Sequence, residues 1–280
     1  MEATHTEAKP IVTKGQIVKA LLALGISEGD HLLVHSGLGK VGKIEGSAQT
    51  VIDAIEEIIG KDGTLIMPTF SQRDFANVYK TWYMDKPSET GYLTEYFRKL
   101  PFVYRSNQET HSVAARGKLA YELTYQHKWY GPHICPFGEY AFAESSPWQK
   151  MYRLNVKVLG FGVDMGAFTF KHLVETRVME HFLGMLKTDE DYKHMTKDVM
   201  TPESLPNGFW PFYRSTGEMK DELTARRCVK EYQLGNAVLW LVNGKEASDT
   251  TYEILMSDPE KWFSEQRVEW MKKCEKLANK

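Results

Sequence analysis

The sequence predicts an α/β fold in which a mixed, partly parallel sheet is flanked by helices. Helix-type and strand-type segments alternate along the first hundred residues, a pattern typical of parallel strands joined by helical crossovers. Polar residues capable of binding or catalysis follow each predicted strand, which is where ligands bind in such sheets. The chain has 280 residues, of which 42% are hydrophobic and 26% charged, and this suits a single large domain over residues 1–280.

The first predicted helix covers residues 14–24, with Thr13 as its N-cap and Gly25 as its end. A short apolar strand is predicted over residues 31–35. The second predicted helix is capped by Ser47 and carries a wide stripe of valine and isoleucine residues that would face the sheet.

The elements that follow are predicted from apolar runs bounded by glycine, proline and polar residues. They are a strand over 64–67, a helix over 89–100, a strand over 102–104, a strand over 156–161, a helix that begins after Thr169, strands over 225–233 and 237–242, and an amphipathic helix over 259–277. The segment 72–88 is predicted to make an excursion over the sheet. The proline-rich segment 189–216 is predicted to be an irregular surface segment that covers a site.

Because ligands bind beyond the carboxyl ends of strands in such sheets, the strand exits are predicted to line one crevice. The residues at these exits are His35, Ser36 and Gly37, then Thr69 and Phe70, then Arg105 and Ser106.

His172 and Glu175 are the strongest catalytic candidates. They lie three residues apart and therefore share one face of the predicted helix. With Thr169 as N-cap, His172 lies in the first turn, where the positive helix end disfavours imidazolium and keeps the ring neutral. A neutral imidazole near a carboxylate can accept a proton. The alternative is a histidine packed between helix and sheet beside a solvated glutamate.

Composition argues against several classes of function. A net charge of −2 gives no general electrostatic basis for binding nucleic acid. The three cysteines, Cys135, Cys228 and Cys274, form no CxxC pair, so we expect no metal site and interpret His133 beside Cys135 as a loop histidine near a buried thiol. We find no run of about 18 apolar residues and no signal peptide, and therefore expect a cytoplasmic protein without membrane contact.

No known nucleophile or nucleotide motif accounts for these residues. The chain has no GxSxG elbow, and neither GxxxxGK[ST] nor GxGxxG follows a predicted strand. The glycine-rich stretch 37–42 lacks a hydroxyl after its lysine, so we interpret it as a tight turn.

Five short motifs, taken in order, resemble those of the aminoglycoside 3-N-acetyltransferase family. They are His35–Leu38, Gly63–Phe70, Arg105–Ser106 with Thr110–Gly117, Pro136–Gly138 with Ser146–Trp148, and Thr169–Glu175. Each is weak alone, but together they cover roughly residues 12–185 in the order of the family. The chain departs from the family pattern at Gly37, where a second serine is frequent, and at Gln108-Glu109, where His-Pro is common.

The resemblance implies an acetyl-CoA-dependent acyltransferase of the antibiotic-resistance type that needs no metal. It implies that His172 is the general base in a direct attack on the thioester, and we choose Glu175 as the residue that orients it. The coenzyme-binding candidates are His35, Ser36, Gly37, Leu38, Thr69, Phe70, Arg105, Ser106, His111 and Ser112.

The residues leave the acceptor open. An aminoglycoside or similar amino sugar is the first hypothesis, another amine metabolite is the second, and a catalytically inactive binding protein of the same fold is the third. Six carboxylates that could hold a polycationic acceptor are Asp164, Glu175, Glu180, Asp189, Glu190 and Asp191. The sequence also leaves open whether the protein forms a homodimer.

Overall fold

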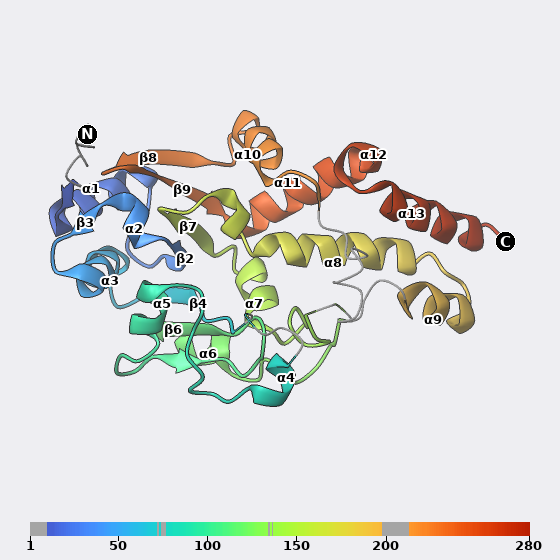
Figure 1. Cartoon of the computed structure of the whole chain (residues 1–280), viewed down its shortest axis with the longest axis horizontal. Helices are drawn as coiled ribbons and strands as arrows, with labels where there is room; N and C mark the ends of the chain where they lie inside the picture. Colours follow the sequence, from blue (N-terminus) through green and yellow to red (C-terminus); the bar gives the residue numbers. More distant parts are fainter. Residues whose placement is uncertain (1–9, 72, 74–76, 134, 136, 198–212) are drawn as a thin grey trace, which may run out of the picture.

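The computed structural model describes residues 10–71, 73, 77–133, 135, 137–197 and 213–280. Its central feature is a seven-stranded mixed sheet with the strand order β5-β6-β4-β2-β7-β9-β8 (Figure 1). The strands, in that order, are Tyr104–Arg105, Val113–Gly117, Thr64–Pro68, His31–Ser36, Lys157–Phe161, Ala237–Asn243 and Lys230–Leu234.

The centre of the sheet is parallel and its two sides are antiparallel. β2 pairs in parallel with β4 on one side and with β7 on the other. The outer pairs β4–β6, β5–β6, β7–β9 and β8–β9 are antiparallel. Two short strands, β1 (Ile11–Val12) and β3 (Lys43–Ile44), form a separate parallel pair. The predicted mixed, partly parallel sheet is therefore confirmed.

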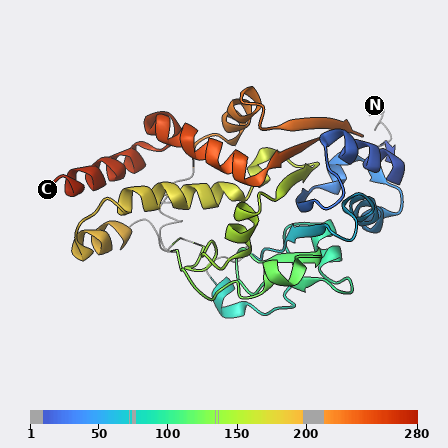
Figure 2. The same cartoon turned by 180° about the vertical axis from the view of Figure 1, so that it is seen from behind.

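Helices cover both faces of the sheet, and the alternation of strand side chains explains why. Leu32 and Val34 of β2 face one hydrophobic cluster, whereas Leu33 between them faces the other. The first cluster includes the buried sides of α1 (Lys14–Leu24), α3 (Ser47–Ile59) and α5 (Tyr92–Phe97). The second includes those of α6 (Ala120–Thr124), α7 (Pro147–Arg153), α8 (Phe170–Leu183), α10 (Thr216–Ala225), α11 (Gly244–Ser257), α12 (Pro259–Trp262) and α13 (Glu265–Ala278). In both views α8 and α11 lie side by side (Figures 1 and 2).

The predicted start of α1 is confirmed, but that of α3 is wrong. Thr13 Oγ1 accepts a hydrogen bond from the backbone N–H of Gln16 at 3.3 Å, and the Gln16 side chain accepts from the Thr13 N–H at 2.9 Å. Ser47 is instead the first helical residue of α3. Gly46 occupies the N-cap position with a φ of 74° and no side-chain cap, because a left-handed turn brings the chain into the helix.

Several predicted boundaries are also wrong. The strand predicted over 102–104 is β5, which begins only at Tyr104, because Phe102 has a left-handed φ of 61°. Consequently Arg105 lies within β5 and not after it. The helix predicted over 89–100 is limited to the six residues of α5. The glycine-rich stretch predicted to be a turn contains a one-turn helix, α2 (Leu38–Val41).

In the C-terminal third, residues predicted as strand or loop are partly helical. Residue 225 ends α10, so the strand predicted from there begins at residue 230. The helix predicted over 259–277 is divided between α12 and α13, with Ser264 at the N-cap of the second. The segment predicted to be irregular over 189–216 begins with a helix, α9 (Asp189–Lys197), while 198–212 lies outside the described residues. Its covering role stays a prediction.

The predicted excursion over 72–88 contains α4 (Val78–Thr81), and residues 72 and 74–76 lie outside the description.

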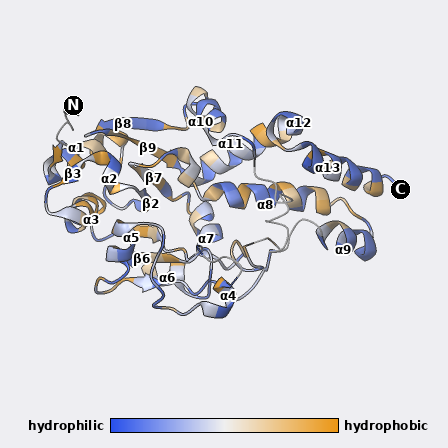
Figure 3. Cartoon of the chain, viewed as in Figure 1, coloured by the Kyte–Doolittle hydropathy of each residue, from blue (hydrophilic) through white to orange (hydrophobic). Residues whose placement is uncertain are grey.

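The sheet has an edge exposed to solvent at β8. This strand is largely hydrophilic, whereas its neighbour β9 is mostly hydrophobic and buried (Figure 3). Charged and polar side chains on an edge strand limit pairing with other chains. Among the described helices, none combines the length and apolarity that crossing a membrane requires.

Candidate active site

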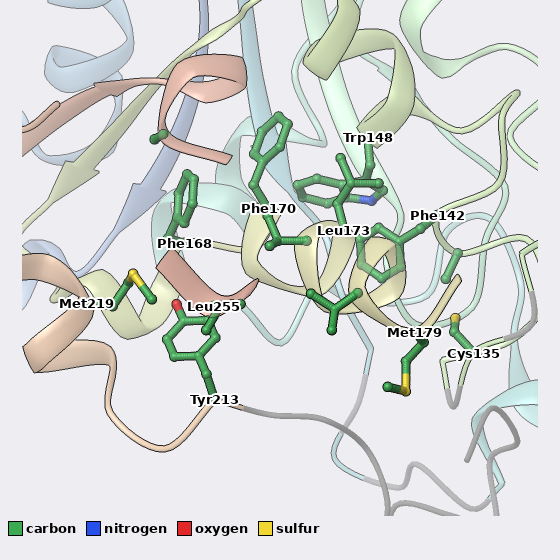
Figure 4. Packing of buried hydrophobic residues seen from close by; sticks show 14 of the residues in the cluster. Cys135, Phe142, Trp148, Phe168, Phe170, Leu173, Met179, Tyr213, Met219 and Leu255 are labelled. Atoms are coloured by element: carbon green, nitrogen blue, oxygen red, sulfur yellow. The ribbon is translucent and has the colours of Figure 1, made fainter. Parts of the chain in front are cut away.

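Core packing fixes the position and rotation of α8, which carries the predicted catalytic residues. Phe170 makes an edge-to-face contact with Trp148 at a centroid distance of 5.9 Å, and Leu173 is fully buried. Figure 4 shows these side chains gathered around the first turns of the helix. Buried residues lie on nearly every side of α8, so a change in its rotation would break the core. The side chains of His172 and Glu175 are therefore held at fixed places.

His172 and Glu175 form a hydrogen-bonded pair, as their spacing predicted. Nδ1 of His172 lies 2.7 Å from Oε2 of Glu175, and the side chains are 14% and 1% exposed. The alternative of a solvated glutamate is therefore wrong. Because a carboxylate accepts the Nδ1 proton, Nε2 is the ring atom that can accept a proton from a substrate.

The pKa of His172 lies well below its usual value, mainly because the ring is buried and secondly because of the charge of Lys171. The sequence argument expected a neutral ring but attributed it to the helix end. Thr169 is the N-cap residue of α8, yet its side chain caps no N–H. Its hydroxyl donates instead to the carbonyl of Ala167 at 3.3 Å, because Thr169 itself has helical backbone angles. Desolvation, and not a capped helix terminus, is thus the principal cause.

A second histidine and several aromatic rings surround His172. The ring of His111 lies edge-to-face with that of His172 at a centroid distance of 5.8 Å. Phe137 contacts both histidines: the centroid of its ring lies 4.5 Å from that of His111 and 4.7 Å from that of His172. Phe70 lies 4.7 Å from His111. We call His111, Phe70, Phe137 and Phe142 the aromatic cage, since the rings of His111, Phe137 and Phe142 contact that of His172 and the ring of Phe70 contacts that of His111.

A pocket of about 280 Å³ lies where the three parallel strands end. Carboxyl ends of adjacent parallel strands meet at one edge of a sheet, which is why the exits of β2, β4 and β7 converge here. The lining residues are His35, Ser36, Pro68, Phe70, Thr90, Val163, Gly166, Ala167, Thr169, Lys171 and His172. Of the predicted site residues, His35, Ser36, Phe70 and His172 therefore line one pocket.

Two polar atoms at the end of β2 lack partners within the described residues. They are Nε2 of His35 and Oγ of Ser36, and both are buried. Burial, followed by the charge of Lys171, lowers the pKa of His35 to about 3. A buried polar atom without a hydrogen bond costs about 1–3 kcal/mol, so a bound molecule that bonds to these atoms would recover that cost.

Gly37 and Leu38 lie behind the pocket wall. The sequence argument assumed that the backbone N–H of Gly37 could donate to a ligand. This N–H instead donates to the carbonyl of Phe161 at 2.8 Å. A Cβ added at Gly37 would lie 2.6 Å from the carbonyl oxygen of Gly162. This close approach of β2 to β7 explains why this chain has glycine where a serine is frequent in the family. Leu38 is the first residue of α2.

Arg105, Thr69 and Ser112 form a bonded frame beside the pocket. The guanidinium of Arg105 donates to the carbonyls of Thr69, Met84 and Lys86 at 2.5–2.8 Å, and to Thr69 Oγ1 at 3.2 Å. Burial lowers its pKa to about 10. Ser112 Oγ donates to the Thr69 carbonyl at 2.9 Å and lies 3.0 Å from Thr69 Oγ1. These polar groups are mostly engaged with the protein itself.

Ser106 is likewise engaged internally. Its Oγ accepts from the backbone N–H of Val113 at 2.9 Å and lies 2.9 Å from Nδ1 of His127. Nε2 of His127 lies 3.1 Å from the carbonyl of Ala141, which can only accept, so His127 donates there and Ser106 donates to its Nδ1. Burial lowers the pKa of His127 to about 3.

Sequence reasoning missed five pocket residues: Thr90 and Val163 in loops, Gly166 and Ala167 in the short 3-10 helix Met165–Ala167, and Lys171 on α8. Thr90 donates to the carbonyl of Pro68 at 2.7 Å, and Lys171 donates to that of Gly166 at 2.8 Å. Val163 lines the pocket one residue after a glycine with a φ of 73°. Only Lys171 carried a signal, since it precedes His172 in the motif.

In the described part of the chain, no group of three or more histidine, cysteine or acidic residues is arranged to hold a metal ion. Cys135 is buried, which raises its pKa to about 12, and His133 is paired with Glu180. A groove of about 450 Å³ beside β5 and α6 is larger than the pocket but includes neither His172 nor His35. We therefore place the site at the strand ends.

The fold and the site define a class: an α/β protein with a buried histidine–carboxylate pair that opens on a pocket at the ends of parallel strands. The particular family follows from the sequence, which matches the aminoglycoside 3-N-acetyltransferase family over residues 33–256. The chain belongs to this family.

Two curated relatives illustrate the similarity. The SPbeta prophage-derived aminoglycoside N(3')-acetyltransferase-like protein YokD of Bacillus subtilis is 31% identical over 187 residues, covering 59% of this chain and 65% of that protein. Aminoglycoside N(3)-acetyltransferase VII of Streptomyces paromomycinus is 29% identical over 185 residues, covering 59% and 60%. The matched region is thus less than two thirds of the length of either relative.

Solved structures share the fold over most of the chain. The crystal structure of YokD has a TM-score of 0.67 and 22% identity, covering 91% of this chain and 97% of that one. A binary complex of AAC-IIIb with CoASH has a TM-score of 0.65 and 19% identity, covering 89% and 97%. At this identity the likeness establishes the fold alone.

Proposed function

We propose that the protein is an acetyl-CoA-dependent N-acetyltransferase whose acceptor is an amine of an aminoglycoside or similar amino sugar. The observation that carries the proposal is the buried His172–Glu175 pair, 2.7 Å apart, at the wall of the strand-end pocket. Membership of the family and the CoASH complex of a protein with the same fold support it.

The residues at the end of β2 fit the acyl end of the coenzyme. His35 Nε2 and Ser36 Oγ are buried polar atoms with no partner among the described residues, and they line the same pocket as His172. A thioester carbonyl or a pantetheine amide would supply the hydrogen-bonding groups that these atoms lack. We assign Gly37, Leu38, Thr69, Arg105, Ser106, His111 and Ser112 to the frame and cage around this end of the site.

His172 acts as the general base. When bound, acetyl-CoA supplies an activated acetyl group on a thiol leaving group. Nε2 of His172 accepts the proton that the acceptor amine loses as its nitrogen bonds to the acetyl carbon, and the proton passes to the departing sulfur. Glu175 holds the ring through Nδ1 and stabilises the imidazolium that forms. Because burial lowers the pKa of His172, the ring stays unprotonated and ready across neutral pH.

We infer further that the whole chain is one acetyltransferase domain in the cytoplasm, with the segment 189–216 beside the acceptor. Its described carboxylates Asp189, Glu190 and Asp191 lie in the first turn of α9, which follows the C-terminal end of α8, so a polycationic acceptor would meet them only if it extends along α8 from His172. Binding of such an acceptor should weaken as salt is added.

The test is release of free CoA thiol with acetyl-CoA and a panel of amines that includes kanamycin, gentamicin and amines that are not aminoglycosides. We expect turnover with an aminoglycoside, and a loss of about 10²–10⁴ in kcat for His172→Ala without loss of CoA binding by calorimetry. His181→Ala, an exposed histidine on the same helix, is the matched control and should keep wild-type turnover.

The outcomes separate the hypotheses. Turnover only with another amine would keep the acetyltransferase chemistry and overturn the aminoglycoside acceptor. CoA binding without turnover on any amine would favour a binding protein of the same fold. Unchanged turnover in His172→Ala would remove His172 from the mechanism.

A further inference from the structure

Gln108 is a buried glutamine that does not line the pocket, yet both the oxygen and the nitrogen of its amide are hydrogen-bonded. Its Oε1 accepts from the backbone N–H groups of Thr110, at 2.9 Å, and of His111. Its Nε2 donates to the carbonyl of Phe137 at 3.1 Å. Only this orientation of the amide satisfies all three groups, so the assignment of oxygen and nitrogen follows from the partners. The side chain thus joins the turn before β6 to the loop that carries Phe137.

The same network determines which nitrogen of His111 carries the proton. The Thr110 hydroxyl lies 2.8 Å from the carbonyl of Phe137 and 3.3 Å from Oε1 of Gln108. Both oxygens can only accept, so the hydroxyl donates to them, mainly to the nearer carbonyl. Oγ1 of Thr110 is then the acceptor for Nδ1 of His111 at 2.9 Å. His111 is therefore protonated at Nδ1, and its Nε2 is an acceptor.

Both ends of this network contact the general base of the proposed reaction. The rings of His111 and Phe137 lie 5.8 Å and 4.7 Å from that of His172. Burial is the main reason for the low pKa of His172, and the cage rings that contact it are among the side chains that bury it. A shift of either ring would change both the direction of His172 and its contact with water.

We propose that Gln108 is a positioning residue: through Thr110 and Phe137 it fixes the tautomer of His111 and closes the aromatic cage on His172. This inference rests on the proposed role of His172 as general base. Gln108 is one of the two residues, Gln108 and Glu109, that stand where His-Pro is common in the family, and the proposal gives it a role. The neighbouring Glu109 is instead paired with Lys128 at the surface.

The groups that can influence the titration of His172 come from several elements. Glu175 and Lys171 lie on α8, His111 precedes β6, and His127 follows α6. His35 lines the same pocket at the end of β2, and Tyr213 lies near Glu175. Gln108 carries no charge, so replacing it by another neutral residue leaves all these charges in place. Any change in titration then reports a change in desolvation or hydrogen bonding.

The principal variant is Gln108→Leu, which keeps the size and removes the polar atoms. Two buried backbone N–H groups lose their acceptor, the cage loosens, and His172 becomes more hydrated. We expect kcat to fall roughly 10-fold to 100-fold with little change in the KM for acetyl-CoA. The acidic limb of the kcat profile should move to higher pH, towards the ordinary histidine value of about 6.5.

Two further variants test the network itself. Thr110→Val removes the hydroxyl that accepts from His111, and should move the acidic limb in the same direction even if Gln108→Leu does not fold. Gln108→Glu keeps an oxygen acceptor for the two N–H groups but adds a charge and loses the donor to the Phe137 carbonyl, so its kcat should lie between those of wild type and Gln108→Leu. Gln233→Leu, at an exposed glutamine on β8, is the matched control and should leave kcat and its pH profile unchanged.

A second readout does not depend on activity. Proton NMR titration follows the imidazole of His172, which is identified by the signal missing in His172→Ala. Its pKa should rise in Gln108→Leu and Thr110→Val. An unmoved pKa, or a lower kcat with the acidic limb unmoved, would show that Gln108 only stabilises the fold and would overturn the proposal. Should the wild-type protein acetylate no amine while the pKa still rises, the proposed function fails and the positioning role stands.

Discussion

Replacing Glu175 by glutamine tests the histidine–carboxylate pair with the smallest perturbation. Gln has the same shape, and its amide oxygen can still accept the proton of Nδ1, so the 2.7 Å hydrogen bond to His172 can persist. The variant loses the negative charge and replaces one carboxylate oxygen by an NH2 group. Because Glu175 is 1% exposed, water does not screen that charge in the wild-type protein.

The expected loss follows from the charge interaction. When His172 accepts a proton, a cation forms beside the carboxylate, and two unit charges about 4 Å apart at an effective dielectric constant of about 20 attract by about 4 kcal/mol. Proton transfer is incomplete in the transition state, so roughly half to all of this energy, ~2–4 kcal/mol, is lost. At about 1.4 kcal/mol per factor of ten, kcat should fall roughly 30-fold to 700-fold.

The assay is steady-state release of CoA thiol between pH 5 and 9, with saturating acetyl-CoA. Without the carboxylate the imidazolium is less stable, so the pKa of His172 falls further and the acidic limb of kcat moves to lower pH. Glu180→Gln is the matched control, since Glu180 lies on the same helix and is also paired with a histidine, His133, that does not line the pocket. A Glu175→Gln variant within threefold of wild type, or an acidic limb at higher pH, would refute the reasoning.

Three further predictions follow. Gly37→Ala should lower the free energy of unfolding by about 1–3 kcal/mol in urea denaturation, whereas Gly39→Ala, where an added Cβ meets nothing within 4 Å, should not lower it. Arg105→Lys should lower the free energy of unfolding by about 1–3 kcal/mol without weakening CoA binding in calorimetry, because the guanidinium bonds to backbone carbonyls. Weaker CoA binding at unchanged stability would make Arg105 a direct coenzyme contact. Burial lowers the pKa of His35 and His127 to about 3, so below about pH 6.5 the unfolded chain binds protons that the folded chain does not. Each of the two residues should therefore lower the free energy of unfolding by about 1.4 kcal/mol for each pH unit that the pH falls between about 6.5 and 3. Equal free energies of unfolding at pH 7.5 and 5 would contradict this.

The parts of the fold that could be predicted are those with a local signal. The Thr13 N-cap and the apolar run of β2 depend on residues close in sequence, and both are confirmed. The wrong boundaries depend on backbone angles that the side chains do not reveal. Ser47 is a good N-cap residue by type, but the chain enters α3 through left-handed angles at Gly46. Phe102 has strand propensity, but a positive φ excludes it from β5.

The candidate site likewise has features that local sequence could predict and features that it could not. His172 and Glu175 could be paired from sequence, because a helix brings residues three positions apart to one face. The contact of His111 with His172 joins residues from different elements, so spacing could not reveal it. The cause of the low pKa of His172 was also missed, since burial depends on side chains from several segments, whereas a helix end can be inferred locally.

The bonded frame explains why a family motif includes residues that do not line the pocket. Arg105, Ser106 and Ser112 match the family pattern, yet their polar groups bond to Thr69, to His127 and to backbone carbonyls. Such residues set the distance between the end of β4 and the loops on either side of it, and an error there displaces Phe70 and the ring of His111 that contacts it. Selection on the position of a pocket wall therefore acts on buried hydrogen bonds as well as on ligand contacts. On this argument, substitutions in the frame should lower stability and kcat together, whereas Ser36→Ala, which removes a buried hydroxyl without a partner among the described residues, should raise the KM for acetyl-CoA without lowering stability.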